Sequence, residues 1–154
     1  MSTMDPVLGA LVRGLHHVAI VVPSLAEAQR TYVERLGLES DGEVEHVPDQ
    51  KVNVLVCHAG GQRIELVEPA ASDSPVSAFL AKRGGGLHHL AYRVESVERA
   101  LEALKAAGLR LIDAAPRPGA HGTRIAFVHP SATHGVLTEL VEEPSHADDE
   151  DWSE

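Results

Sequence analysis

The sequence predicts an α+β fold in which two tandem βαβββ modules form one curled sheet around a shared cleft. The first observation is an internal repeat: residues 15–22 read LHHVAIVV, and residues 87–94 read LHHLAYRV. The second is a matching echo near the end of each half, where residues 64–68 read IELVE and residues 138–142 read TELVE. Each half therefore begins with a histidine-bearing strand and ends with a glutamate-bearing strand, as expected for a duplicated supersecondary unit.

The first half follows an order of strand, helix and three strands. Residues 15–22 are rich in β-branched side chains and stop at a proline, which is typical of a strand. Ser24 followed by Glu27 is a capping box, and it predicts a helix over 25–36 that ends at a glycine. Three further strands are expected, with a Gly-Gly turn before the last, at 43–48, 52–58 and 62–68.

The second half repeats this order after a connecting segment. Ser74 and Pro75 mark the start of a short helix over 75–82. The remaining elements expected are a strand at 87–94, a helix at 96–107 and strands at 109–113, 124–129 and 135–142. A glycine-rich loop over 117–122 separates the first two of those last three strands.

Composition supports a single domain with an aliphatic core. Of the 154 residues, 44% are hydrophobic and only 3% are aromatic, so Val, Leu, Ile and Ala must supply most of the core. The formal net charge of −10 is concentrated near the C-terminus, where residues 142–154 contain no Lys or Arg. We expect a leader at 1–14, one domain at 15–142 (modules 15–68 and 87–142, linker 69–86) and a disordered acidic tail at 143–154.

Several classes of protein are not expected. No basic stripe indicates a nucleic-acid partner. A single cysteine, Cys57, excludes an internal disulfide framework and fits a reducing cytosol. No signal peptide is recognisable, and no apolar run approaches the length of about 20 residues that a membrane span needs. A cytoplasmic protein without a membrane segment is therefore expected.

Strand alternation selects the side chains that enter the cleft. Neighbouring residues of a strand point to opposite faces, so His17 shares a face with Ala19, whereas His16 belongs to the bulky apolar face. The repeat places His89 and His88 in the same way. Only the second histidine of each pair is thus expected in the cleft, and the first should face a helix or lie at the rim.

Two histidines and two carboxylates converging from four strands predict a divalent metal site. Imidazole suits Zn, Co, Ni and Fe, and carboxylate oxygen also accepts Mn. The candidate ligands, one histidine and one glutamate from each half, are His17, Glu65, His89 and Glu139. Taken singly, each histidine has a competing interpretation as a hydrogen-bonded core residue, and each glutamate as a solvent-facing charge. The joint repetition favours the metal site, with coordination positions left open for a substrate.

Short motifs in a fixed order relate the chain to a known family. They lie throughout residues 15–142 and include residues 64–69 (IELVEP), 86–91 (GLHHLA), 110–113 (RLID) and 119–122 (GAHG). With these motifs the chain resembles the vicinal-oxygen-chelate superfamily, and within it the methylmalonyl-CoA epimerases. The resemblance implies the paired βαβββ modules and the four-ligand metal site.

The implied reaction interconverts (2R)- and (2S)-methylmalonyl-CoA by proton transfer at C2. The resemblance implies a divalent metal ion that stabilises an enolate. Co²⁺ is the metal expected, and Mn²⁺, Ni²⁺ and Zn²⁺ are alternatives. It also implies that Glu139 is both a ligand and a proton carrier. A homodimer is expected by analogy with the fold alone.

Inversion needs a second proton carrier, and here the chain departs from the family pattern. Some members have a glutamate where this sequence has Val54, which cannot transfer a proton, so either another group serves or this strand aligns with the family one residue away. His121 is the candidate that replaces it, because imidazole has a suitable pKa and the glycine-rich loop could close over the cleft. The alternative is that residues 119–122 only shape the pocket for the acyl group.

Three other functions compete on the same scaffold. A glyoxalase-type lyase would also use four ligands, but on glutathione thiol adducts. An extradiol dioxygenase would need Fe(II) with two histidines and one carboxylate, so the fourth ligand, Glu65, argues against it. A non-catalytic binding or resistance protein would hold a small molecule in the cleft without a metal.

Overall fold

The computed structural model describes residues 6–144 and confirms the α+β class, with one curled eight-stranded sheet ordered β2-β3-β4-β1-β5-β8-β7-β6. The first strands of the two halves, β1 (Val12–Val21) and β5 (Gly86–Val94), pair antiparallel at the centre. Each first strand also pairs in parallel with the last strand of its own half, which is β4 (Gln62–Pro69) or β8 (Thr138–Glu142). The repeat seen in the sequence therefore becomes a pseudo-twofold sheet.

The first half contains every element expected there. Its helix is α1 (Leu25–Gln29), and it continues as a π-helical turn, η2 (Arg30–Arg35). Strands β2 (Glu39–Val47) and β3 (Val52–Ala59) complete the half. As the capping box predicts, the Ser24 side chain accepts a hydrogen bond from the Glu27 N–H.

The second half contains α2 (Pro75–Arg83), α3 (Val97–Ala106), β6 (Arg117–Pro118) and β7 (Arg124–Val128). Short 3₁₀ turns also occur: η1 (Gly9–Leu11), η3 (Ala120–Gly122) and η4 (Pro130–Ala132). The predicted strand at 109–113 is wrong, because only Leu111 makes an isolated bridge, to Val128. The Phe127 carbonyl accepts from both Ile112 N–H and Asp113 N–H, and the Asp113 carboxylate accepts the Phe127 N–H at 2.8 Å, so this segment lies beside β7 without forming a regular ladder.

The predicted strand at 135–142 begins later than expected, at Thr138. His134 and Gly135 both have positive φ (59° and 91°), which is incompatible with an extended strand. β1 begins earlier than expected, at Val12, inside the segment assigned to the leader. The predicted tail at 143–154 lies outside the described residues except for Glu143 and Pro144.

The second glutamate of each repeated motif, Glu68 at 64–68 and Glu142 at 138–142, has a structural role. Glu68 Oε1 accepts the Leu25 N–H at 2.8 Å, and Glu142 Oε1 accepts the Val97 N–H at 3.0 Å. Leu25 and Val97 are the first residues of α1 and α3, so each carboxylate satisfies an unpaired amide at a helix N-terminus. The repeated glutamate thus attaches the helix of each half to the last strand of the same half.

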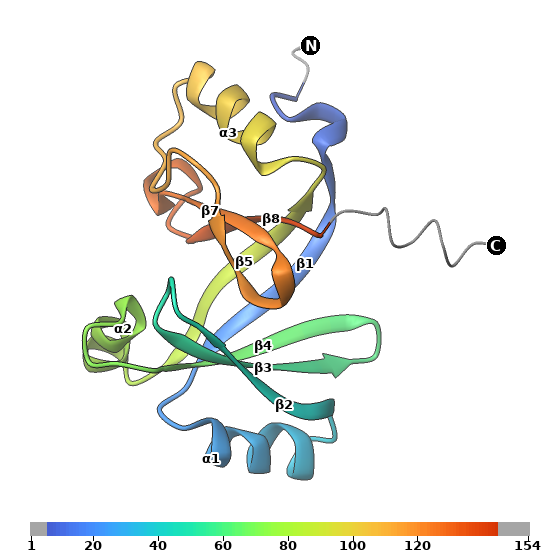
Figure 1. Ribbon diagram of the computed structural model, residues 1–154, viewed down its shortest axis with the longest axis vertical. Helices are drawn as coiled ribbons and strands as arrows, with labels where there is room; N and C mark the ends of the chain where they lie inside the picture. Colours follow the sequence, from blue (N-terminus) through green and yellow to red (C-terminus); the bar gives the residue numbers. More distant parts are fainter. Residues whose placement is uncertain (1–5, 145–154) are drawn as a thin grey trace, which may run out of the picture.

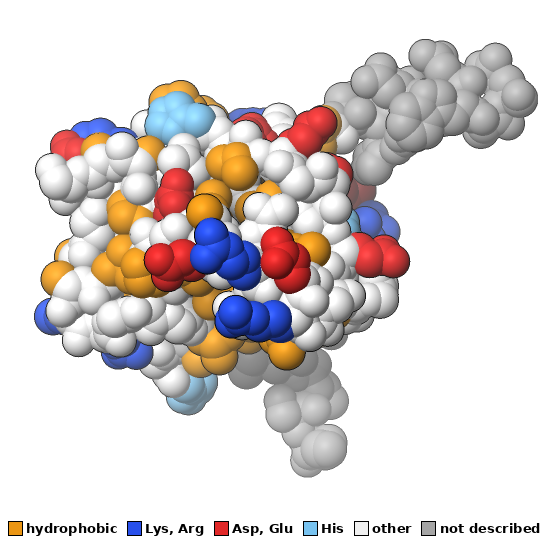
Figure 2. Space-filling model, turned by 90° about the horizontal axis from the view of Figure 1, so that it is seen from below, with side chains coloured by type: hydrophobic (Ala, Val, Ile, Leu, Met, Phe, Trp, Pro, Cys, Tyr) orange, Lys and Arg blue, Asp and Glu red, His pale blue; other side chains and the backbone are white. Residues whose placement is uncertain are grey.

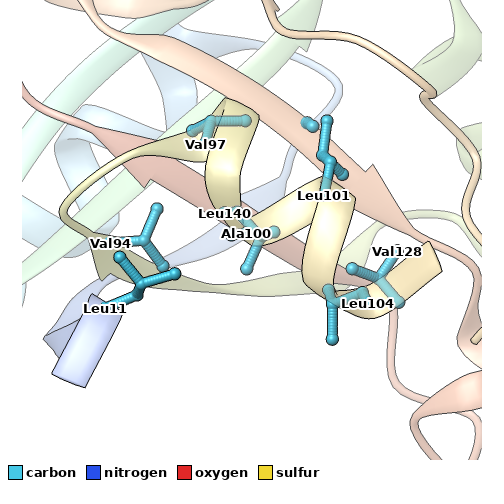
Figure 3. Packing of buried hydrophobic residues seen from close by; sticks show 9 residues of the cluster. Leu11, Val94, Val97, Ala100, Leu101, Leu104, Val128 and Leu140 are labelled. Atoms are coloured by element: carbon cyan, nitrogen blue, oxygen red, sulfur yellow. The ribbon is translucent and has the colours of Figure 1, made fainter. Parts of the chain in front are cut away.

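Helices and sheet form the core in two matching layers. Figure 1 shows α1 and α3 at opposite ends of the molecule, with the sheet between them. Figure 3 shows α3 directing Val97, Ala100, Leu101 and Leu104 toward Val94, Val128 and Leu140. On the other face, which carries Ala19, α2 packs through Val76, Phe79 and Leu80.

Shortening one buried side chain of α3 should show how much the packing of this helix contributes to the free energy of unfolding. Leu101 is 3% exposed, so Leu101→Ala is expected to lower the free energy of unfolding by about 2–5 kcal/mol, measured by urea denaturation. The exposed neighbour Glu102 supplies the control, because Glu102→Ala should change stability by less than about 0.5 kcal/mol. Equal effects of the two variants would contradict the packing described.

The surface has mixed charge on the face seen in Figure 2. There, Lys and Arg side chains lie among Asp and Glu side chains, and no basic stripe crosses the described residues of this face. Within residues 6–144, no helix is both long and apolar enough to cross a membrane.

Candidate metal centre

The register of the central strands brings the four predicted ligands to one place. Ala19 on β1 lies between His89 on β5 and Glu65 on β4. The pseudo-twofold equivalent, Ala91 on β5, lies between His17 on β1 and Glu139 on β8. Residues paired across a sheet point to the same face, so the four polar side chains surround two small alanines on the concave face.

Three of the four candidates converge on one another at ligand distances. Glu139 Oε1 lies 3.1 Å from His17 Nε2 and 2.9 Å from His89 Nε2, and the two Nε2 atoms are 3.2 Å apart. Three ligands bound at right angles about 2.1 Å from one ion would be about 3.0 Å apart. The observed triangle therefore has the size of one face of a coordination octahedron.

Glu65 approaches the same cluster from another direction. Its side chain is 9% exposed, and its Oε2 lies 3.4 Å from His17 Nδ1, on the other nitrogen of the ring. The described residues accordingly contain two overlapping groups with metal-ligand spacing, one of His17, His89 and Glu139 and one of His16, His17 and Glu65. All four predicted ligands are thus neighbours, but only three present atoms to a common point.

The expectation that His16 and His88 lie outside the cleft is wrong. The β1–β5 register shifts between Leu15 and His17, and again at the position of His88. At such a β-bulge one strand has an extra residue, and the strict alternation of faces is lost. Both side chains therefore line the cavity, and their Nδ1 atoms lie 2.7 Å and 2.8 Å from the Nδ1 atoms of His17 and His89.

The cavity has a polar floor and apolar walls. The floor consists of the four predicted ligands with His16 and His88, and Gln50 and Thr123 add polar groups. The walls are aliphatic and aromatic: Val47, Val52, Val54, Val67, Val76, Ile125, Phe127 and Val141. Val54 is buried in this wall, at 4% exposed. Strand β3 therefore has an aliphatic side chain where the family resemblance implies a glutamate.

The structure places the His121 ring away from the floor of the cavity. Ala120 and Thr123 of the same loop line the cavity, whereas the His121 side chain is 49% exposed. Its Nδ1 lies 3.2 Å from Glu45 Oε1, and its backbone N–H donates to both Glu45 oxygens at 2.8 Å and 3.1 Å. A positive φ of 60° at His121 completes this tight turn.

Further contacts hold this loop against the first half. Arg117 bridges Asp49 of the β2–β3 turn at 2.9 Å and Asp113 at 3.2 Å. Gln50 Nε2 donates to the Pro118 carbonyl at 3.4 Å. These partners could not be predicted from sequence patterns, because ion pairs between distant exposed segments depend on the tertiary fold.

Burial and mutual interactions shift the pKa values of the acidic ligands in opposite directions. Burial raises the pKa of Glu65 above its usual range. Burial acts the same way on Glu139, but the His89 and His17 imidazoles outweigh it and lower the pKa of Glu139 to about 2. Burial lowers the pKa of His17, yet Glu139 and Glu65 more than offset it, so this pKa lies above its ordinary value. The cluster thus concentrates positive charge against a buried carboxylate.

A divalent cation fits these residues. Glu139 Oε1 is fully buried and accepts no hydrogen bond of acceptable geometry from the described part of the chain. A buried carboxylate oxygen normally has a hydrogen-bond donor or a cation as its partner, and a bound metal ion would supply one here. Two imidazole nitrogens beside it complete a donor set that suits Zn, Co, Ni, Fe and Mn.

Comparison with known proteins decides the family. The family model described as the glyoxalase/bleomycin resistance protein/dioxygenase superfamily matches residues 16–127. The chain belongs to this superfamily. The match contains both histidine strands and β4 with Glu65, and it ends in β7.

Relatives within the superfamily include named epimerases. The chain is 45% identical to an uncharacterized protein of Bacillus subtilis, YqjC, over 83% of this chain and 91% of the relative. It is 39% identical to the ethylmalonyl-CoA/methylmalonyl-CoA epimerase of Cereibacter sphaeroides, over 84% of this chain and 98% of the relative. The crystal structure of methylmalonyl-CoA epimerase from Mycobacterium tuberculosis superposes with a TM-score of 0.83 at 33% identity, covering 97% of each chain. This superfamily member is therefore related to methylmalonyl-CoA epimerases.

Proposed function

We propose that this protein is a divalent-metal-dependent epimerase that interconverts (2R)- and (2S)-methylmalonyl-CoA. The observation that carries the proposal is the buried Glu139 oxygen between His17 and His89, because it joins a candidate metal ligand and a carboxylate base in one side chain. The relation to named epimerases supports the choice of substrate.

The four ligands in this proposal are His17, Glu65, His89 and Glu139, around a divalent cation such as Co²⁺, Mn²⁺, Ni²⁺ or Zn²⁺. Such a cation, when bound, supplies Lewis-acid stabilisation of the negative charge that develops on the thioester oxygen. Glu65 presents its carboxylate at the Nδ1 side of His17, so it would join the other three by a change of side-chain rotamer.

The chain's own residues perform the proton transfer. The C2 proton lies between a thioester and a carboxylate, and a base on one face of C2 must remove it while an acid on the other face returns it. Glu139 is the proposed carrier on one face. The apolar walls, among them Val54 and Phe127, keep bulk water from the reacting carbon and so strengthen the electrostatic interactions there.

His121 is the proposed carrier on the other face. It is the ionisable residue of the loop whose Ala120 and Thr123 line the cavity, and its ring must leave Glu45 and turn inward to reach the substrate. If it does, His121→Ala should reduce turnover by about 10²–10⁴-fold without changing metal content. Turnover close to that of the unmodified protein would instead assign the loop to shaping the pocket.

The assembly proposed around this site is a cytoplasmic homodimer of one domain. The domain would comprise modules 15–68 and 87–142 joined by the linker at 69–86. Sedimentation equilibrium tests the dimer, and a monomeric mass would remove that part of the proposal.

Solvent deuterium incorporation at C2 tests the function. With Co²⁺ or Mn²⁺ added, methylmalonyl-CoA in D₂O should lose its C2 proton signal in the NMR spectrum far faster than in the protein-free control. Incorporation at the control rate would overturn the epimerase proposal. A protein that then still bound a divalent ion would favour a lyase of the glyoxalase type, and one that bound none would favour a binding protein.

A further inference from the structure

The two histidine pairs form one continuous row of imidazole rings. His16, His17, His89 and His88 follow one another with ring centroids 5.0, 5.3 and 5.1 Å apart, each ring edge-on to the next. The row is held by Nδ1–Nδ1 contacts of 2.7 Å and 2.8 Å at its two ends. The candidate ligands occupy the middle of the row, and the residues displaced by the bulges occupy its ends.

Hydrogen-bond direction at the first end determines which nitrogen of His17 is free. An Nδ1–Nδ1 contact needs one ring to donate and the other to accept. His16 Nε2 lies 2.8 Å from Glu143 Oε2, and a carboxylate can only accept. Bonded to Glu143, His16 would carry its proton on Nε2, its Nδ1 would accept from His17 Nδ1, and the lone pair of His17 would be left on Nε2, beside Glu139.

A second neighbour of His16 favours the opposite arrangement. Arg63 Nη1 lies 3.1 Å from the same His16 Nε2, and a guanidinium can only donate. If His16 accepted from Arg63, its proton would sit on Nδ1 and point at His17, whose Nε2 would then carry hydrogen and could not bind a metal. Glu143 and Arg63 thus compete to set the tautomer of His17.

The other end of the row has no carboxylate in the described residues. His88 contacts His89 through Nδ1, and the Phe79 ring packs edge-on against it with centroids 4.9 Å apart. An aromatic contact fixes the plane of the His88 ring but not its tautomer. Among the described residues, only the first-half end of the row therefore has a carboxylate that can direct the hydrogen bond.

We propose that His16, directed by Glu143, is a positioning residue that holds His17 in the tautomer with a free Nε2. This inference rests on the proposed metal site. Residues that accept a hydrogen bond from a metal-bound histidine fix its ring and tautomer, and their loss typically costs 10–100-fold in metal affinity. Glu65 is a weaker alternative acceptor, since its Oε2 lies 3.4 Å from His17 Nδ1 against 2.7 Å for His16.

Zn²⁺ affinity, measured by competition with a chromophoric chelator, tests the proposal independently of catalysis. His16→Ala should weaken Zn²⁺ binding by about 10–100-fold, whereas His58→Ala, at an exposed position of β3, should leave it unchanged. The two neighbours of His16 should act in opposite senses: Glu143→Ala should weaken binding, and Arg63→Met should not. Far-UV circular dichroism of each variant checks that the fold is intact.

The tautomer itself can be observed. In the long-range ¹H–¹⁵N spectrum of the Zn²⁺-loaded protein, His17 should show a protonated Nδ1 and a metal-bound Nε2. If the unmodified protein binds Zn²⁺, and the folded His16→Ala and Glu143→Ala variants bind it with the same affinity, this inference alone is overturned. No Zn²⁺ binding by the unmodified protein would overturn both this inference and the metal site.

Discussion

Glu139→Gln is expected to reduce the rate of C2 proton exchange by about 10²–10⁴-fold per bound metal ion. The amide has nearly the volume of the carboxylate, so the cavity keeps its shape, but it can neither take nor return a proton. The carboxylate is 5% exposed and lies 3.1 Å and 2.9 Å from two imidazole nitrogens, so water cannot readily replace it. Rates should be measured by deuterium incorporation and divided by the metal content of the same sample.

The exposed Glu102 of α3 provides the matched control, because Glu102→Gln makes the same chemical change far from the cavity. It should retain full exchange. If Glu139→Gln exchanged C2 protons within tenfold of the unmodified protein at equal metal content, Glu139 would not be a proton carrier. Its role would then be limited to holding the cation.

His17→Ala and His89→Ala should each abolish tight metal binding. Each removes one corner of the ligand triangle and takes away one of the two imidazole nitrogens that lie 3.1 Å and 2.9 Å from Glu139 Oε1. The loss should exceed the 10–100-fold range of residues that only orient a ligand, and so be more than about 100-fold. Isothermal titration with Co²⁺ measures it, and C2 exchange should fall in proportion to bound metal.

His46→Ala is the control for these variants, because His46 is an exposed histidine of β2 bonded only to Asn53. It should bind Co²⁺ as the unmodified protein does. A folded His89→Ala protein that bound Co²⁺ with unchanged affinity would show that the triangle is not the metal site. Folding should be checked first by thermal denaturation, since both histidines are part of a buried cluster.

The duplicated pattern made most strands and the convergence of the four candidate ligands predictable. His17 and His89 stand at equivalent positions of repeated strands, and Glu65 and Glu139 at equivalent positions of repeated echoes. Strand alternation then places all four on the concave face, as the register with Ala19 and Ala91 shows. Such periodicity is local, so a single sequence carries it.

Features that depend on tertiary contacts could not be predicted. The bulges at His16 and His88 shift one strand by a residue, and no composition signal marks them. Residues 109–113 have strand-like composition, but Ile112 and Asp113 both donate to the one carbonyl of Phe127, so only an isolated bridge forms, at Leu111. The outward direction of the His121 ring follows from Glu45, which is far from it in the chain.

Two small residues, Ala19 and Ala91, lie between the candidate ligands. Ala19 and Ala91 are both fully buried, and each separates a histidine from a glutamate on neighbouring strands. A larger side chain at either position would fill the space where the ligand atoms meet. Both halves therefore repeat a small residue between the candidate ligands, which leaves space among their side chains.

A crystal of the Co²⁺-loaded protein, measured at the cobalt absorption edge, tests the central claim most directly. The account predicts one anomalous peak per chain, within about 2.3 Å of Nε2 of His17, Nε2 of His89 and a carboxylate oxygen of Glu139, with Glu65 turned to the same ion. A peak bound by other residues, or a fully loaded crystal with no peak between these side chains, would contradict it.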